Sequence, residues 1–249
     1  MAEDPKQTDL GEADAGPPYV FGFGFRNGAA CEMRWEDVVS HADDYDFVWL
    51  HLNMLNEEAR EWITARPDIP AAAASALLAG ETRPRMTSFE NGLVVNLRGV
   101  NLNEGAEPED MVSIRIWISN KMIVSTRRRR LMAAHDLRGD IQNGLRIENT
   151  GALLARIAIK LTDRADPHVQ DVEDQVDELE TEILEGGQPG LRAKLADARR
   201  SAVHFRRFIA PQRDALNRLA ADDSALFDHK AKTELRELAD RVTRMTEDL

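Results

Sequence analysis

Cysteine is almost absent from this 249-residue sequence, in which Cys31 is the only one. A single thiol excludes an internal disulfide and any zinc site built from cysteines alone. Long hydrophobic runs are also missing, because no stretch approaches the roughly 18–20 apolar residues that a membrane-spanning helix needs. The N-terminus has no basic segment followed by an apolar core, which argues against a secretory signal. These absences predict a soluble protein of a reducing cytoplasm.

Positive charge is scarce as well, since 32 Lys and Arg residues face 44 Asp and Glu residues, for a net charge of -12. This balance disfavours nucleic acid or anionic lipid as the main partner. The six histidines show no pair at a zinc-ligand spacing, so no transition-metal site is predicted. Nucleophile-elbow, P-loop and kinase motifs are missing, and we therefore predict no enzyme.

The first half of the chain mixes strands with short helices. Residues 1–18 are polar and acidic, with several Gly and Pro residues, and are predicted to be a disordered leader. Apolar runs and period-two patterns predict strands over residues 19–25, 47–52, 93–100, 111–119 and 122–126. Helices are predicted over residues 35–42, 57–65 and 71–79, with Asn56 as the cap of the second. Together these elements predict an α/β domain over residues 19–147, with helices packed on a mixed sheet.

The strand signal disappears in the second half, and helices take its place. Residues 129–143 are predicted to be helical, and Asn149 or Thr150 caps a long helix that reaches Glu185. Apolar residues there repeat every three or four positions, as they do after the Gly/Pro-rich break at residues 186–190. Residues 148–220 are therefore predicted to form this long helix and an antiparallel helical hairpin. A last helix, within residues 221–249, is predicted to be capped by Asp222, Asp223 or Ser224 and to stop at Leu249 without a C-terminal signal, as if cut.

The two arms of the hairpin carry opposite charge. Opposite charges on facing helices favour pairing between the arms in one register. Binding of hard cations by the acidic arm is an open alternative, although its spacing lacks the loop geometry of a dedicated site. The acidic arm holds Asp171, Glu173, Asp174, Asp177, Glu178, Glu180, Glu182 and Glu185. The basic arm holds Arg192, Lys194, Arg199, Arg200, Arg206, Arg207 and Arg213.

Four short strings occur in an order that resembles a known family. They are Trp49-Leu-His-Leu-Asn53, Ala79-Gly-Glu-Thr-Arg-Pro-Arg85, Ile123-Val-Ser-Thr-Arg127 and Ala210-Pro-Gln-Arg-Asp214. With the acidic-then-basic hairpin, residues 19–249 resemble the cytoplasmic part of CorA-type metal ion transporters, in particular their zinc-transporting ZntB branch. The family-like motif residues are Trp49, His51, Asn53, Arg83, Pro84, Arg85, Arg127, Pro211, Gln212, Arg213 and Asp214.

The resemblance implies an α+β fold, with an N-terminal mixed β-sheet and packed helices, an antiparallel helical hairpin and the start of a long stalk helix. It also implies a homopentamer at the cytoplasmic face of the bacterial inner membrane, with a funnel that gathers and gates divalent cations. The pore, its two membrane helices and their Gly-x-Asn loop are not in this sequence, so membrane contact is expected only through those missing helices. Stalk-helix acids would then attract cations in the funnel. These candidates are Glu234, Glu237, Asp240, Glu247 and Asp248.

Several points stay open at this stage. The resemblance points to zinc, but the sequence leaves magnesium, cobalt and nickel as alternatives, and it assigns no metal ligand. The helical segment from residue 150 onward would also suit a soluble scaffold or adaptor without a transport role. Two hydrophobic segments joined by a Gly-x-Asn loop after Leu249 in the gene would favour the transporter over the scaffold.

Overall fold

The computed structural model describes residues 17–249 except residues 81 and 187–188. Most of the predicted leader and two residues of the predicted break, Gly187 and Gln188, therefore lie outside the described residues. The strands are β1 (Tyr19–Arg26), β2 (Ala29–Glu32), β3 (Phe47–Asn53), β4 (Arg85–Phe89), β5 (Gly92–Gly99), β6 (Val112–Ile118) and β7 (Met122–Arg127). The helices are α1 (Trp35–His41), a short 3-10 turn (Ala42–Asp44), α2 (Glu57–Ala65), α3 (Ala71–Leu77), α4 (Met132–Gln142), α5 (Thr150–Leu184), α6 (Leu191–Ala220) and α7 (His229–Glu247).

The strands form one mixed sheet in the order β2-β1-β3-β7-β6-β5-β4. The pair β3–β7 is parallel, and the other five neighbouring pairs are antiparallel. All five predicted strands are present, with ends that differ by a residue or two. The two edge strands, β2 and β4, were not predicted, because they are short and mostly exposed and so lack an apolar pattern.

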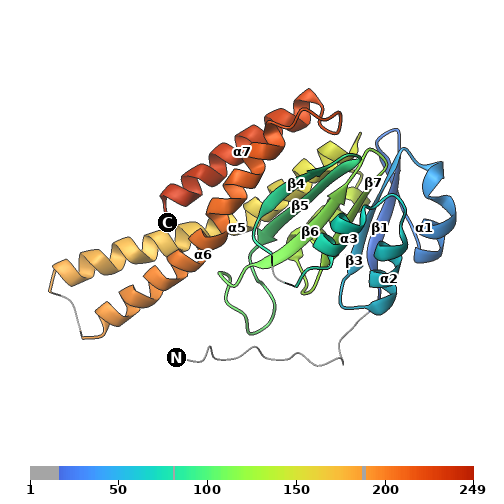
Figure 1. Cartoon of the computed structure of the whole chain (residues 1–249). Helices are drawn as coiled ribbons and strands as arrows, with labels where there is room; N and C mark the ends of the chain where they lie inside the picture. Colours follow the sequence, from blue (N-terminus) through green and yellow to red (C-terminus); the bar gives the residue numbers. More distant parts are fainter. Residues whose placement is uncertain (1–16, 81, 187–188) are drawn as a thin grey trace.

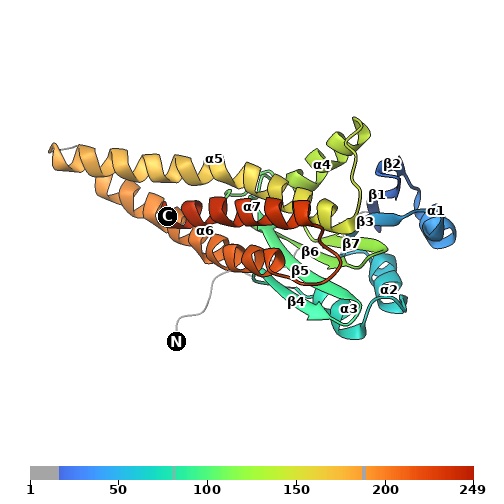
Figure 2. The same cartoon turned by 90° about the horizontal axis from the view of Figure 1, so that it is seen from above.

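Helices cover both faces of the sheet (Figure 2). A smaller core lies on the α1–α3 side and includes Leu50, Val94 and Trp117. The larger core lies on the other side and continues from the sheet through α4 and α5 into α6 and α7. Nearly every residue of β3 is buried, as predicted for a strand within the sheet. The predicted domain division at residues 147 and 220 remains a prediction.

The predicted hairpin is confirmed, since α5 and α6 run side by side and extend beyond the sheet (Figure 1). Asn149 caps α5, with its Oδ1 accepting from the backbone N–H of Ala152 at 2.8 Å. In the part of the chain that the structure describes, no helix is both long enough and apolar enough to cross a membrane.

The predicted start of the last helix was wrong. The N-cap of α7 is Asp228, whose Oδ1 accepts from the backbone N–H of Ala231 at 2.7 Å, and not one of Asp222, Asp223 and Ser224. Leu226 and Phe227 are buried in the larger core, because the chain here crosses the first turn of α5. Helix α7 can begin only after this crossing. Asp222 instead accepts from the N–H of Ser224 at 2.9 Å within the preceding turn.

Candidate functional site

The first and third motif strings meet on the parallel pair β3–β7, where His51 lies opposite Ser125. Trp49 Nε1 donates to Ser125 Oγ at 2.9 Å, and His51 Nδ1 lies 2.8 Å from the same oxygen. All three side chains are fully buried, and the His51 ring stacks on Phe21. Ser125 Oγ also reaches the carbonyl of Leu50 at 3.2 Å. The shared hydroxyl therefore joins the two strings inside the core, where His51 is out of reach of an ion in solution.

Positively charged side chains lie near the two histidines His51 and His135. Burial is the main reason why the pKa of His51 lies well below its usual range, and Arg127 and His135 lower it further. Burial also lowers the pKa of His135, with added effects from Arg130, Arg127 and Arg138. His51 Nε2 is buried without a hydrogen-bond partner, so a proton added there would be unpaired as well as desolvated. His51 is therefore neutral near pH 7.

This burial predicts a specific pH dependence of stability. Above a pH of about 6.5, the ordinary pKa of histidine, His51 is neutral in both the folded and the unfolded chain. Below this pH, His51 is protonated in the unfolded chain but stays neutral in the folded chain. The free energy of unfolding should therefore fall by up to about 1.4 kcal/mol for each pH unit. Urea unfolding at pH 7.5, 6.0 and 5.0 measures this slope.

The variant His51→Gln should remove this contribution to the slope, although it also lowers stability at every pH. The matched control, His229→Gln, alters an exposed histidine and should keep the slope of the unchanged protein. An unchanged slope in His51→Gln would contradict the assignment to His51.

The second and fourth motif strings meet at Arg98 of β5, which belongs to neither. Gln212 Oε1, on α6, accepts from the backbone N–H of Arg98 at 2.7 Å. The Arg98 guanidinium donates to the carbonyl of Thr82 at 2.8 Å and to the carbonyl of Met111. Its Cζ also lies 4.0 Å from the ring centre of Phe208 on α6. Pro84 is buried beside Thr82, whereas the other motif residues of these strings are exposed or half-buried, namely Arg83, Arg85, Pro211, Arg213 and Asp214.

A second strand arginine supports the same loop. Arg115 is fully buried, and its Nη2 donates to the carbonyl of Gly80 at 2.6 Å. Burial first, and then Arg98 and Arg128, lower its pKa to about 10, which leaves it charged at neutral pH. We did not predict either arginine as important. An arginine within an apolar strand was the available signal, because a buried guanidinium needs carbonyl or acidic partners.

The acidic candidates on α7 fall into two groups. Glu234 faces α5, where its Oε1 lies 2.9 Å from Arg156 Nη2. Glu237, Asp240, Glu247 and Asp248 are exposed. Arg236 and Arg244 are exposed on the same helix, so this surface carries both signs of charge.

Helix α7 is fixed to α5 along most of its length. The two caps bond to each other, with Asn149 Nδ2 donating to Asp228 Oδ2 at 2.8 Å. Further along, Arg241 pairs with Asp163 and Asp166 of α5, at 2.6 Å each. The partners are 75 to 79 residues apart in sequence, and this nearly constant offset shows that α5 and α7 run parallel.

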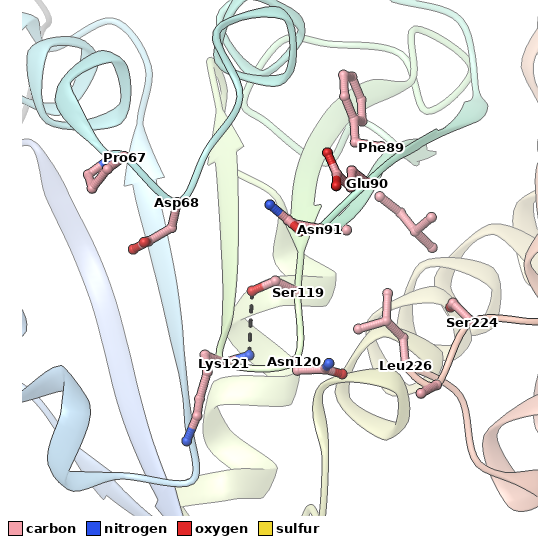
Figure 3. A pocket seen from close by; sticks show the side chains of 13 residues that line it. Pro67, Asp68, Phe89, Glu90, Asn91, Ser119, Asn120, Lys121, Ser224 and Leu226 are labelled. Atoms are coloured by element: carbon pink, nitrogen blue, oxygen red, sulfur yellow. Dashed lines mark hydrogen bonds between the residues drawn. The ribbon is translucent and has the colours of Figure 1, made fainter.

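A hollow of about 570 Å³ opens where four loops meet (Figure 3). Its carboxylates are Asp68, from the α2–α3 loop, and Glu90, from the β4–β5 turn, and Asp68 pairs with Arg66 at 2.5 Å. Lys121 adds a positive charge to the same lining. Among residues 17–249, apart from residues 81 and 187–188, no three His, Cys, Asp or Glu side chains are grouped to hold a metal ion. Sequence reasoning missed the hollow, because its lining comes from segments far apart in the chain.

Several known proteins are similar to this chain in sequence and in fold. The zinc transport protein ZntB of Yersinia enterocolitica is 33% identical over 201 residues, which are 81% of this chain and 61% of that protein. The structure of the full-length CmaX protein matches 94% of this chain and 74% of its own, with a TM-score of 0.84 and 31% identity. The ZntB cytoplasmic domain from Vibrio parahaemolyticus matches 93% of this chain and 90% of its own, with a TM-score of 0.79 and 24% identity, which confirms the predicted fold.

This chain matches only part of the length of its curated relatives. This chain spans 61% of the length of the Yersinia zinc transport protein. The family described as CorA-like Mg2+ transporter protein matches residues 44–249, which is most of the chain. The chain therefore belongs to the CorA-like Mg2+ transporter protein family, as the four motif strings predicted.

Proposed function

We propose that this chain is the cytoplasmic part of a divalent-cation transporter at the bacterial inner membrane, with zinc as its ion. The similarity to zinc transport proteins over 81% of the chain carries this proposal. The match to a ZntB cytoplasmic domain, over nearly the whole of both chains, supports the same role by fold. Membrane contact would come only through segments outside this sequence. The role is one of binding and gating, and it needs no catalytic residue.

The proposed working form is a homopentamer in which α7 lines a central funnel. In such a ring the exposed acids of α7 would concentrate cations near the pore entrance, because like-charged walls focus their field in a narrow space. Glu237 and Asp240 lie at the middle of the exposed side of α7, and Glu247 and Asp248 lie at its end. Glu234 is held by Arg156 and would contribute less.

Cation flux tests this role directly. In the complete transporter reconstituted in vesicles, the pair Glu237→Gln with Asp240→Asn should lower zinc flux about two- to ten-fold at ~0.01 M salt, and much less at ~0.5 M salt, where charges are screened. The control pair Glu57→Gln with Glu61→Gln removes the same charge from exposed positions on α2 and should leave flux unchanged. Equal flux for the two pairs at low salt would contradict the funnel role.

The same vesicles identify the ion. Zinc is expected to cross faster than magnesium, cobalt or nickel at equal concentration. Faster magnesium flux would overturn the assignment of zinc while leaving the transporter role intact. Native mass spectrometry of the assembly would test the five-fold stoichiometry.

A further inference from the structure

The charged arms of the hairpin pair with each other much less than their sequence predicted. Between described residues of the two arms, one ion pair forms, from Arg199 Nη2 to Glu180 Oε1 at 2.6 Å, with side chains that are 62% and 44% exposed. Other ion pairs of the basic arm join neighbours on α6 itself, Arg200 with Asp197 and Arg213 with Asp214. Most of the charge on each arm therefore faces solvent.

The helical spacing places many of these charges on the sides of the arms that point away from their common seam. On α5, Asp174 lies roughly 160° around the helix from the seam residue Val172 and roughly 140° from Leu179. We call this outer surface of α5 the acidic face. Its exposed side chains are Asp171, Asp174, Asp177, Leu184 and Glu185, whereas Glu178 and Glu182 line a hollow between the arms together with Lys194 and Asp197 of α6.

The outer surface of α6 is its counterpart, and we call it the basic face. It lies opposite seam residues such as Ala198 and Phe205, which are buried. Its exposed side chains are Arg192, Arg200, Val203, Arg206 and Arg207, whereas Arg199 reaches Glu180 of α5.

Each face also carries one strongly exposed apolar side chain. Leu184 is 87% exposed on the acidic face, and Val203 is 65% exposed on the basic face. Among the described residues these are the two most exposed large hydrophobic side chains. A single exposed apolar residue is ordinary, but an apolar side chain beside charges of one sign, matched by a second one beside charges of the opposite sign, fits a contact of complementary charge.

We propose that the basic face of one copy of this chain binds the acidic face of the next copy. The two faces cannot meet within one chain, because they point away from the same seam. Val203 also lies 12 positions after the start of α6, about 18 Å along the helix from the hairpin tip near Leu184. Such a contact is heterologous, so each copy keeps one free face for a further copy, and the chain of contacts closes into a ring when the rotation allows it. This inference rests on the proposed homo-oligomer and names the surface that holds it together.

Charge reversal tests the contact. The variant Arg200→Glu with Arg207→Glu gives a chain with two acidic faces, and Asp174→Lys with Asp177→Lys gives a chain with two basic faces. Each alone should associate at least about ten-fold more weakly than the unchanged chain in sedimentation at ~0.1 M salt, and a mixture of the two should associate again. All four positions are exposed, so unchanged thermal melting serves as the folding control.

Cross-linking locates the contact independently. With the exposed Cys31 replaced by serine, chains carrying Leu184→Cys are mixed with chains carrying Val203→Cys and oxidised. The mixed disulfide dimer should exceed both homodimers, and ~0.5 M salt should lower its yield.

The outcomes separate this inference from the proposed function. Association that ignores both charge reversals, with no excess of the mixed disulfide, would overturn the contact while leaving a transporter held together by other surfaces. Chains that stay monomeric at every concentration would overturn it as well. Loss of zinc selectivity in the flux assay would not bear on the contact.

Discussion

Replacing Gly151 by alanine should lower the free energy of unfolding by about 3 kcal/mol, which is the upper end of the usual cost of overpacking a core. Gly151 is buried in the first turn of α5, where the segment leading to α7 crosses it. A Cβ at this position would lie 2.1 Å from the carbonyl oxygen of Leu226 and 3.0 Å from Cδ1 of Phe227. This backbone cannot easily retreat, because the Leu226 and Phe227 side chains are themselves buried.

A second helical glycine provides the matched control. A Cβ on Gly139, in α4, would meet nothing within 4 Å beyond its own turn of the helix. The variant Gly139→Ala should therefore raise stability by about 0.5–1 kcal/mol, because alanine is the better helix former. Urea unfolding of both variants measures the difference. Similar stabilities would show that α5 and the Leu226 segment can separate without cost.

Replacing Arg98 by alanine should cost about 2–4 kcal/mol. The change removes the donors of the Thr82 and Met111 carbonyls and the cation over the Phe208 ring, in a half-buried place where water cannot fully substitute. The backbone bond to Gln212 can survive, since it uses the N–H of residue 98. The Thr82 loop and α6 should therefore loosen together, with faster amide exchange in the buried part of α6.

The control for this prediction lies in the same loop. Arg83 is exposed, and Arg83→Ala should change stability by less than about 0.5 kcal/mol. A cost for Arg98→Ala as small as that of Arg83→Ala would contradict the role given to the Arg98 guanidinium. Faster exchange confined to the loop would instead show that α6 is held by Gln212 alone.

Local signals in the sequence predicted most of the fold. Asn56 and Asn149 were predictable caps, because a cap uses only the backbone of the next turn. The start of α7 was not predictable in the same way. Asp222 and Ser224 look like caps locally, but burial of Leu226 and Phe227 against α5 delays the helix to Asp228. The start of α7 is therefore set by packing between Leu226 and Gly151, which are about 75 residues apart in sequence.

The candidate site shows the same limit. The motif strings containing His51 and Gln212 stood out as residue types in order, and the structure places both at contacts between elements. Arg98 is the residue that joins two strings, and its place in a largely apolar strand is the one local sign of its role. Its importance depends on where Thr82 and Phe208 arrive in space, and that information is not local.

The parallel pairing of α5 and α7 gives the chain a mechanical lever. The two helices are joined at their caps and again at Arg156 and Arg241, so a tilt of α7 carries α5 with it. Helix α5 has 35 residues, or about 52 Å of length. A tilt of only ~5° about its capped end would therefore swing the hairpin tip by about 4–5 Å, roughly the width of one side chain. Displacements too small to alter the packing around Gly151 would thus be amplified at the far end of the arms.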